Sequence, residues 1–119
     1  MMKILFFTVA IALVPMLAGA EDGRASGTID ERAVDIALDC SQWEDGSEAT
    51  ARAADGSEFE AVRLGYNDSL AIIWKTDEKR YQLMFGDVPF ATTVTASTEF
   101  SNRATGETFM AEITIDCAG

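Results

Sequence analysis

Hydrophobic and polar residues alternate along two segments of this chain. In the segment 33–43 the apolar positions are Val34, Ile36, Leu38 and Cys40. In the segment 107–117 they are Phe109, Ala111, Ile113, Ile115 and Cys117. A period of two residues is that of a β-strand with one buried face. We therefore predict strands over 33–43 and 107–117, each with its cysteine on the apolar face.

Between these segments, short hydrophobic runs are separated by turn residues at intervals of about ten residues, which is typical of all-β domains. The runs predict five further strands, over 48–53, 58–64, 69–75, 80–85 and 92–100. Asp55-Gly56 predicts a two-residue hairpin turn. A short helix stays open as the alternative within 47–64, because Ser57 and Glu60 have the spacing of a capping box. The predicted fold is all-β, a single antiparallel β-sandwich of seven to eight strands over residues 28–119.

The first twenty residues have the pattern of a cleavable secretory signal peptide. Lys3 precedes the apolar run 4–14, and the small residues 18–20 precede an acidic pair. Ala20 stands where a lipid-attachment box has its cysteine, so we expect no membrane anchor after cleavage. We predict that residues 1–20 are removed, that residues 21–27 form a flexible leader, and that the protein is periplasmic or secreted.

The two cysteines of the chain both follow the predicted signal peptide. In an oxidising compartment an even pair is most simply a disulfide. Because Cys40 and Cys117 both face the core of their strands, a bond between them would join the first and last of the predicted strands from the inside. The 99 residues that remain after cleavage are enough for one domain with a thin core, to which a cross-link adds stability.

The charge of the chain is strongly acidic. Removal of residues 1–20 takes away one lysine, which leaves eight basic and 20 acidic side chains and a net charge of −12. This charge argues against nucleic acids and anionic membrane surfaces as partners and permits a cationic one. The chain has no histidine, which excludes Ser-His-Asp and Cys-His catalysis and any metal site with histidine ligands.

Acidic and aromatic side chains supply the candidate binding residues. The density of acids in 44–60 would permit a hydrolase that uses two carboxylates, but a domain of this size rarely has the necessary cleft. The acids do not have the spacing of a calcium-binding loop, so we predict no metal or cofactor. Alternation places Trp43 opposite Cys40, towards solvent or a partner, but packing over the sheet edge or under a loop is the favoured interpretation. The candidate binding residues are Trp43, Glu44, Asp45, Tyr66 and Asp68.

The order of motifs resembles that of the mycobacterial surface lipoprotein antigen family. The resemblance covers most of the chain after residue 20, in the segments 27–30, 60–65, 79–83 and 109–117 and in the two cysteines. It implies a small β-rich domain that is exported and non-catalytic. It does not imply surface attachment, because the anchor cysteine of that family is absent.

These patterns favour an exported, non-enzymatic binding or interaction module of the cell envelope, with a protein or lipid ligand. An alternative is an acidic inhibitor or immunity-type protein that blocks a cationic enzyme. A small carboxylate-dependent hydrolase is the third hypothesis.

Overall fold

The computed structural model describes residues 22–101 and 104–118, so the predicted signal peptide lies outside the described residues. The described residues contain no helix, and hence none long and apolar enough to cross a membrane. Their eight strands are β1 (Gly23–Ile29), β2 (Arg32–Gln42), β3 (Glu48–Ala53), β4 (Phe59–Leu64), β5 (Ser69–Lys75), β6 (Arg80–Phe85), β7 (Thr93–Ser101) and β8 (Thr108–Asp116).

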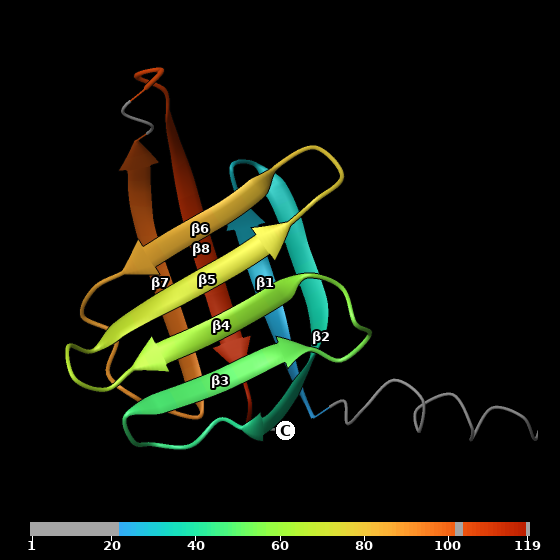
Figure 1. Ribbon diagram of the computed structural model, residues 1–119, viewed down its shortest axis with the longest axis vertical. Coiled ribbons are helices and arrows are strands. Elements are labelled where there is room, and N and C mark those ends of the chain that lie inside the picture. The colour runs from blue at the N-terminus through green and yellow to red at the C-terminus, as the bar shows by residue number, and fades with distance from the viewer. Residues whose placement is uncertain (1–21, 102–103, 119) are drawn as a thin grey trace, which may run out of the picture.

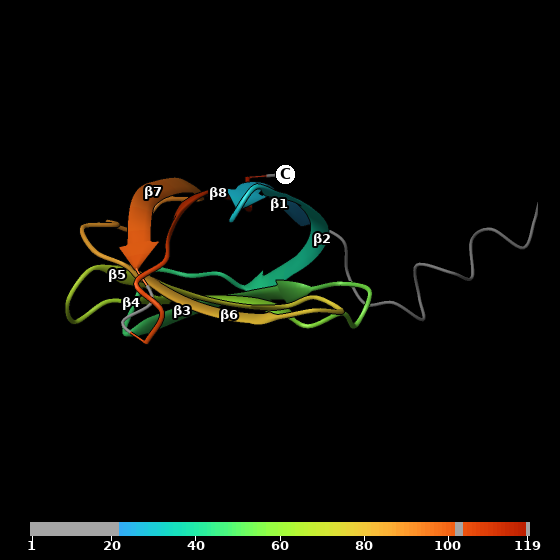
Figure 2. The ribbon, with the colours of Figure 1, turned by 90° about the horizontal axis from the view of Figure 1, so that it is seen from above.

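All eight strands belong to one antiparallel sheet with the order β6-β5-β4-β3-β2-β1-β8-β7. Strands β1 to β6 form a meander, and the β7–β8 hairpin adds to the other side of β1 (Figure 1). The sheet folds over on itself, so that β3–β6 form one layer and β1, β7 and β8 the other (Figure 2). Strand β2 joins the layers, since it pairs first with β1 and then with β3, with a register shift between Asp39 and Gln42. The predicted all-β fold is confirmed.

The hydrophobic core fills the space between the two layers. Its largest fully buried side chains are Ile29, Leu38, Leu70, Ile72, Ile113 and Ile115. Trp74 stacks on Tyr81 with ring centroids 5.7 Å apart, and the edge of Tyr81 meets Phe109 at 5.8 Å. Because these side chains come from both layers, each layer buries its inner face against the other.

The disulfide Cys40–Cys117 is present, as predicted. It joins the second half of β2 to the residue after β8, and the two Cα atoms are 5.8 Å apart. Both cysteines are half-buried and pack against the border of the core. The bond therefore fastens the two strands that flank β1.

The prediction of a flexible leader over residues 21–27 is wrong for residues 23–27, which belong to β1. This strand is central, since it pairs with β2 on one side and β8 on the other. Small residues occupy several inward positions of β1, so the segment looks like a linker in the sequence. Ala25 is nevertheless fully buried. At Gly27, whose φ is 134°, a Cβ atom would lie 2.1 Å from the carbonyl oxygen of Glu112. Close approach of β8 therefore requires glycine there.

The segment 47–64 folds as the β3–β4 hairpin, and the helix alternative is wrong. The connection is longer than the predicted two-residue turn, because residues 54–58 separate the strands. Gly56 has a φ of 84°, and the Asp55 carboxylate accepts a hydrogen bond of 2.9 Å from the Ser57 amide. These are the roles that glycine and aspartate ordinarily have in a turn.

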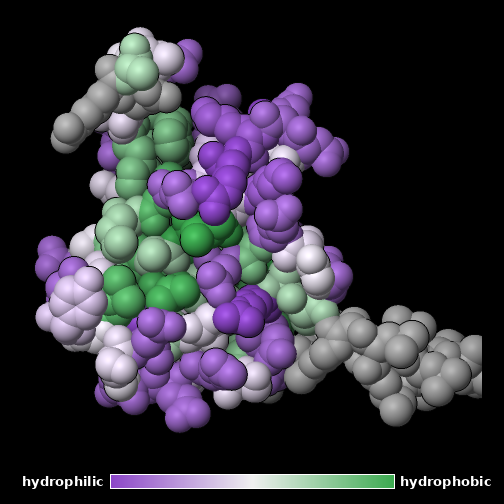
Figure 3. Space-filling view, viewed as in Figure 1, coloured by the Kyte–Doolittle hydropathy of each residue, from purple (hydrophilic) through white to green (hydrophobic). Residues whose placement is uncertain are grey.

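A second apolar surface lies on the outer face of β4–β6. Val62, Ala71 and Met84 are register partners on three adjacent strands, and Leu64 and Ile73 lie beside them. Four of these side chains are half-buried, and Met84 is 54% exposed. Figure 3 shows hydrophobic side chains gathered over this part of the layer, with hydrophilic ones around them. The layer thus has apolar residues on both faces.

Candidate functional site

Three loops meet at one end of the β3–β6 layer, at the left of Figure 1. They are the β2–β3 loop (43–47), the β4–β5 loop (65–68) and the β6–β7 loop (86–92). We call these residues the acidic loop end. All five candidate binding residues from the sequence are on these loops.

Arg63 connects the three loops. It lies on the inward-facing side of β4, near the end of that strand. Its side chain is only 6% exposed. Nε donates to the carbonyl of Val88 at 3.1 Å, Nη2 donates to the carboxylate of Asp68, and Nη1 lies 3.6 Å from Oδ1 of Asp45. Each of these partners belongs to a different loop. The planar guanidinium group, with five donors, is suited to such a junction.

Backbone contacts hold the same loops together independently of Arg63. The Gly65 amide donates to the Ser47 carbonyl at 3.0 Å, and the Val88 amide donates to the Asp68 carbonyl at 2.7 Å. A Cβ atom on Gly65 would lie 2.1 Å from the carbonyl oxygen of Gly46, so the first two loops are in direct contact. The acidic loop end is therefore one packed unit.

The surface of this unit is acidic and carries one prominent aromatic ring. Tyr66 is 81% exposed, at the tip of the β4–β5 loop. The same three loops carry four exposed carboxylates: Glu44, Asp45, Asp68 and Asp87. The three loops contain no lysine or arginine. The basic residue that β4 contributes to these loops, Arg63, is buried. The exposed surface of the loops is therefore negative and attracts positive charge.

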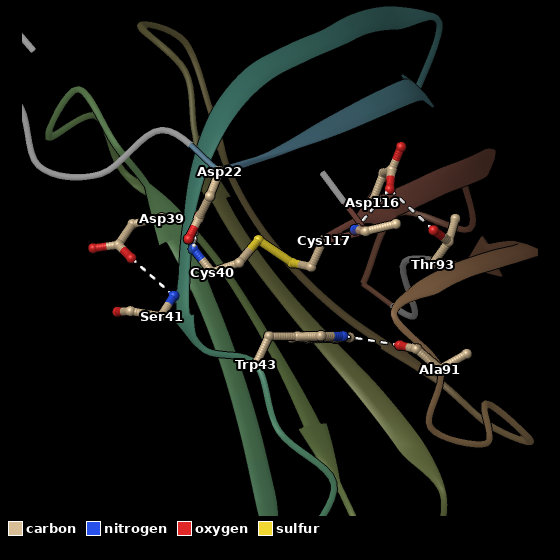
Figure 4. The surroundings of a disulfide bond; sticks show 10 residues. Asp22, Asp39, Cys40, Ser41, Trp43, Ala91, Thr93, Asp116 and Cys117 are labelled. Carbon is tan, nitrogen blue, oxygen red and sulfur yellow. Dashed lines mark hydrogen bonds between the residues drawn. A yellow bond between two sulfur atoms is a disulfide. The ribbon is translucent and has the colours of Figure 1, made fainter.

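Trp43 does not face solvent, so the outward position that alternation alone indicates is wrong and the favoured packed position is confirmed. The indole is buried beneath the β6–β7 loop, where Nε1 donates to the Ala91 carbonyl at 2.9 Å (Figure 4). Its ring lies 5.9 Å from that of Phe90. The register shift after Asp39 interrupts the alternation on which the prediction relied. Trp43 therefore closes the core next to the disulfide, packed under the β6–β7 loop.

We predict that Trp43→Phe lowers the free energy of unfolding by about 1.5 kcal/mol, because one hydrogen bond and part of the buried ring are lost. Urea denaturation of the oxidised protein measures this. Tyr66→Phe, at an exposed site, is the control and should change the stability by less than about 0.5 kcal/mol. Equal stability of Trp43→Phe and the parent would mean that the bond to Ala91 contributes nothing.

Three carboxyl groups elsewhere have a pKa below the ordinary value for aspartate. For Asp39 the main cause is the Ser41 amide, for Asp55 the Ser57 hydroxyl, and for Asp116 the Ala118 amide. These bonds stabilise the fold above the unfolded-state pKa, and their contribution is lost as the pH falls through the lowered folded-state value. A general acid requires the opposite shift. These groups therefore serve turns and strand ends.

Two of the four carboxylates of the acidic loop end lie beside a cation. Asp45 and Asp68 both face the guanidinium of Arg63. Within residues 22–101 and 104–118, no group of three or more acids and cysteines has the geometry of a metal site. What this arrangement offers chemically is a fixed acidic surface for contact.

The candidate residues predicted from the sequence do not include Arg63, Asp87 or Phe90. Arg63 had a detectable signal, because it follows Phe59 and Ala61 at alternate positions on the apolar face of its strand. A charged side chain at such a position must find partners inside the protein. No such signal marks Asp87 and Phe90. The position of their loop depends on how the strands before and after it are arranged in the fold.

Comparison of the chain with protein-family models, curated proteins and solved structures finds no match.

Proposed function

We propose that this protein is an exported, non-enzymatic binding module that uses the acidic loop end to contact a cationic protein surface. The observation that carries the proposal is Tyr66, a large aromatic ring that is 81% exposed among carboxylates. Tyrosine is enriched at the centres of protein interfaces because it combines a large contact area with a polar group.

The packing of the three loops supports the proposal further. Arg63 and two backbone hydrogen bonds already hold the loops in place. A surface that is ordered before binding loses little conformational entropy in the complex, so more of its contact energy remains as affinity. The disulfide is consistent with an oxidising compartment outside the cytoplasm. The family resemblance seen in the sequence also implies an exported, non-catalytic domain.

An acidic inhibitor or immunity-type protein is the more specific form of this proposal. Such a protein would insert the acidic loop end into the cationic cleft of an enzyme. The net charge of −12 would speed this association by electrostatic steering. The two forms share one contact surface and differ in whether the partner loses activity in the complex.

We predict that a photo-cross-linking amino acid at position 66 joins this protein to a specific cationic partner in the extracytoplasmic fraction of the expressing cell. The same amino acid at Asp77, on the exposed turn at the other end of the layer, is the matched control. The adduct at 66 should be lost in about 1 M salt, where the Debye length is about 3 Å. No adduct at position 66, or the same adducts from both positions, would contradict the proposal.

The identified partner then allows a quantitative test. Tyr66→Ala should weaken binding about 30-fold, as expected when an interface loses an aromatic residue worth about 2 kcal/mol. Glu44→Gln combined with Asp87→Asn should slow association and reduce its salt dependence, with dissociation nearly unchanged. These two side chains make no hydrogen bond or ion pair with other described residues, so we expect the fold to be unaffected.

A further inference from the structure

The eight-stranded sheet ends in two strands, β6 and β7, that have a pairing partner on one side only. β6 pairs with β5, and β7 pairs with β8. The two edges approach each other where the sheet folds over, but they form no ladder within the described part of the chain. An open edge exposes backbone donors and acceptors to which another extended chain can bind.

The register shows which backbone groups of β6 are open. The Thr76 amide donates to the Lys79 carbonyl, so Thr76 and Lys79 form a hydrogen-bonded pair at the hairpin turn. Hydrogen-bonded pairs recur at every second residue of an antiparallel ladder, which directs the backbone groups of Tyr81, Leu83 and Phe85 towards β5. The amides and carbonyls of Arg80, Gln82 and Met84 therefore face the open edge.

Two surface grooves run along this edge, one after the other. A groove of about 280 Å³ is lined by residues 79–83 of the β6 side and by Phe100, Ser101 and Phe109 of the other layer. A groove of about 450 Å³ is lined by residues 84–88 and by residues 95–98 of β7. Aromatic rings form the floor between them, since Phe100 lies 5.3 Å from Phe85 and 5.7 Å from Phe109. The inward side chains of an added strand would rest on these rings.

On the outer face of the sheet, the apolar row also stops at β6, because no strand follows it. The row Val62, Ala71 and Met84 ends at Met84, which is 54% exposed. An apolar residue opposite Met84 would continue the row and cover that side chain, because directly opposed side chains on one face of a sheet are in contact.

Arg80 supplies a charge that no described residue of the protein pairs. Its side chain is exposed and makes no hydrogen bond or ion pair with any described residue. Lys75 pairs with Glu58, and Lys79 lies 3.9 Å from Asp30, so Arg80 differs from its basic neighbours. An acidic residue opposite Arg80 on an added strand would complete a cross-strand pair.

We propose that the free edge of β6 binds an extended segment of a partner protein, which adds antiparallel to β6 as a ninth strand. The segment has an apolar residue opposite Met84 and an acidic residue opposite Arg80, four positions later in its own sequence. The two residues that face Leu83 and Tyr81 are apolar, since they point onto the aromatic floor. This is recognition by β-strand addition, in which the backbone supplies affinity and alternate side chains supply specificity.

Neither the β7 edge nor a second copy of this chain meets these requirements as well. The outward side chains of β7 are polar, and Thr93 and Thr95 already bond to β8 through Asp116 and Thr114. A second copy that paired β6 with β6 about Gln82 would place Met84 opposite Arg80 and leave the charge unpaired. It would also bring together two chains that each carry a net charge of −11.

The test uses a synthetic peptide with valine opposite Met84, Leu83 and Tyr81, glutamate opposite Arg80 and threonine elsewhere. Binding to the purified, oxidised protein is followed by amide hydrogen exchange and by fluorescence anisotropy. The amides of Arg80, Gln82 and Met84 should exchange freely in the unbound protein and become protected with peptide. A peptide that is N-methylated at the two residues facing Gln82 and Met84 should bind about 30-fold more weakly, because two backbone hydrogen bonds are lost.

Two protein variants complete the design. Gln82→Pro removes only an edge-facing amide and should abolish binding while the thermal transition is retained, because proline is tolerated at sheet edges. Arg80→Glu should weaken binding of the glutamate peptide about tenfold. A peptide with lysine in place of that glutamate should bind this variant with restored affinity. This pair keeps the test decisive if the proline variant does not fold.

Three outcomes would overturn the proposal. The first is equal binding of the parent and N-methylated peptides, or no binding at millimolar concentration. The second is protection of the amides of Thr95, Ser97 and Glu99 in place of those of β6. The third is self-association of the free protein that Gln82→Pro abolishes, which would assign this edge to a second copy. Because Tyr66 lies outside this edge, Tyr66→Ala should leave peptide binding unchanged, so this proposal and that of the acidic loop end fail separately.

Discussion

Replacement of Cys40 and Cys117 by alanine is expected to lower the free energy of unfolding by about 4 kcal/mol. The bond spans 77 positions of the sequence, and closure of a loop of that length removes much of the conformational entropy of the unfolded chain. The bond also lies over the start of β1, where a Cβ atom on Gly23 would be 2.3 Å from the Cys40 sulfur. Loss of the bond therefore frees β2, β8 and the first residues of β1 together.

Guanidinium denaturation of the oxidised parent and of the double alanine variant measures this effect. The parent in reductant is the matched control, since it loses the cross-link but keeps both sulfur atoms. The reduced parent and the double alanine variant should lose similar amounts of unfolding free energy. The slope of the transition should rise in both, because the unfolded chain exposes more surface without the cross-link. A loss below about 1 kcal/mol in both samples would mean that the noncovalent contacts of β1 with its neighbours already determine the stability.

Replacement of Arg63 by methionine is expected to lower the free energy of unfolding by about 3 kcal/mol. Methionine keeps most of the side-chain volume but leaves the Val88 carbonyl without its donor and removes the charged hydrogen bond to Asp68. Arg63→Lys should recover about a third of the loss, because a lysine keeps the charge but not the planar fork.

Arg52 is a matched control for Arg63 in the neighbouring strand. It also pairs with a carboxylate, with Nε 2.8 Å from Oε2 of Glu60, but its side chain is 69% exposed. Arg52→Met should change the stability by less than about 1 kcal/mol, as is usual for exposed ion pairs. Equal effects of Arg63→Met and Arg52→Met would show that Arg63 does not hold the loops together.

The elements that the sequence predicted well are those whose inward side chains are large. Alternation along residues 33–43 and 107–117 identified β2 and β8 and placed both cysteines correctly, because Val34, Leu38, Ile113 and Ile115 give a strong period of two. The aromatic residues of β5 and β6 likewise identified the hairpin that carries them.

Strand β1 escaped prediction, and alternation alone misplaced Trp43, for local physical reasons. The inward positions of β1 include Ala25 and Gly27, whose small size is required by the close approach of neighbouring strands and conceals the alternation. At Trp43 the alternation was clear but ended in a register shift, which depends on how β2 passes from β1 to β3. Arg63 could be recognised as a charge on an apolar face, but its partners come from loops that only the complete fold brings together.

The position of β1 in the sheet has a consequence for how the protein reaches its folded state. β1 comes first among the described strands, and one of its two neighbours, β8, comes last. A chain that enters a compartment from its N-terminal end can assemble the meander of β1 to β6 early, but β1 stays half-paired until β8 arrives. Contacts between such distant segments slow folding and leave an unfinished edge exposed to other chains. Because Cys117 follows β8, closure of the cross-link cannot precede the arrival of this last strand.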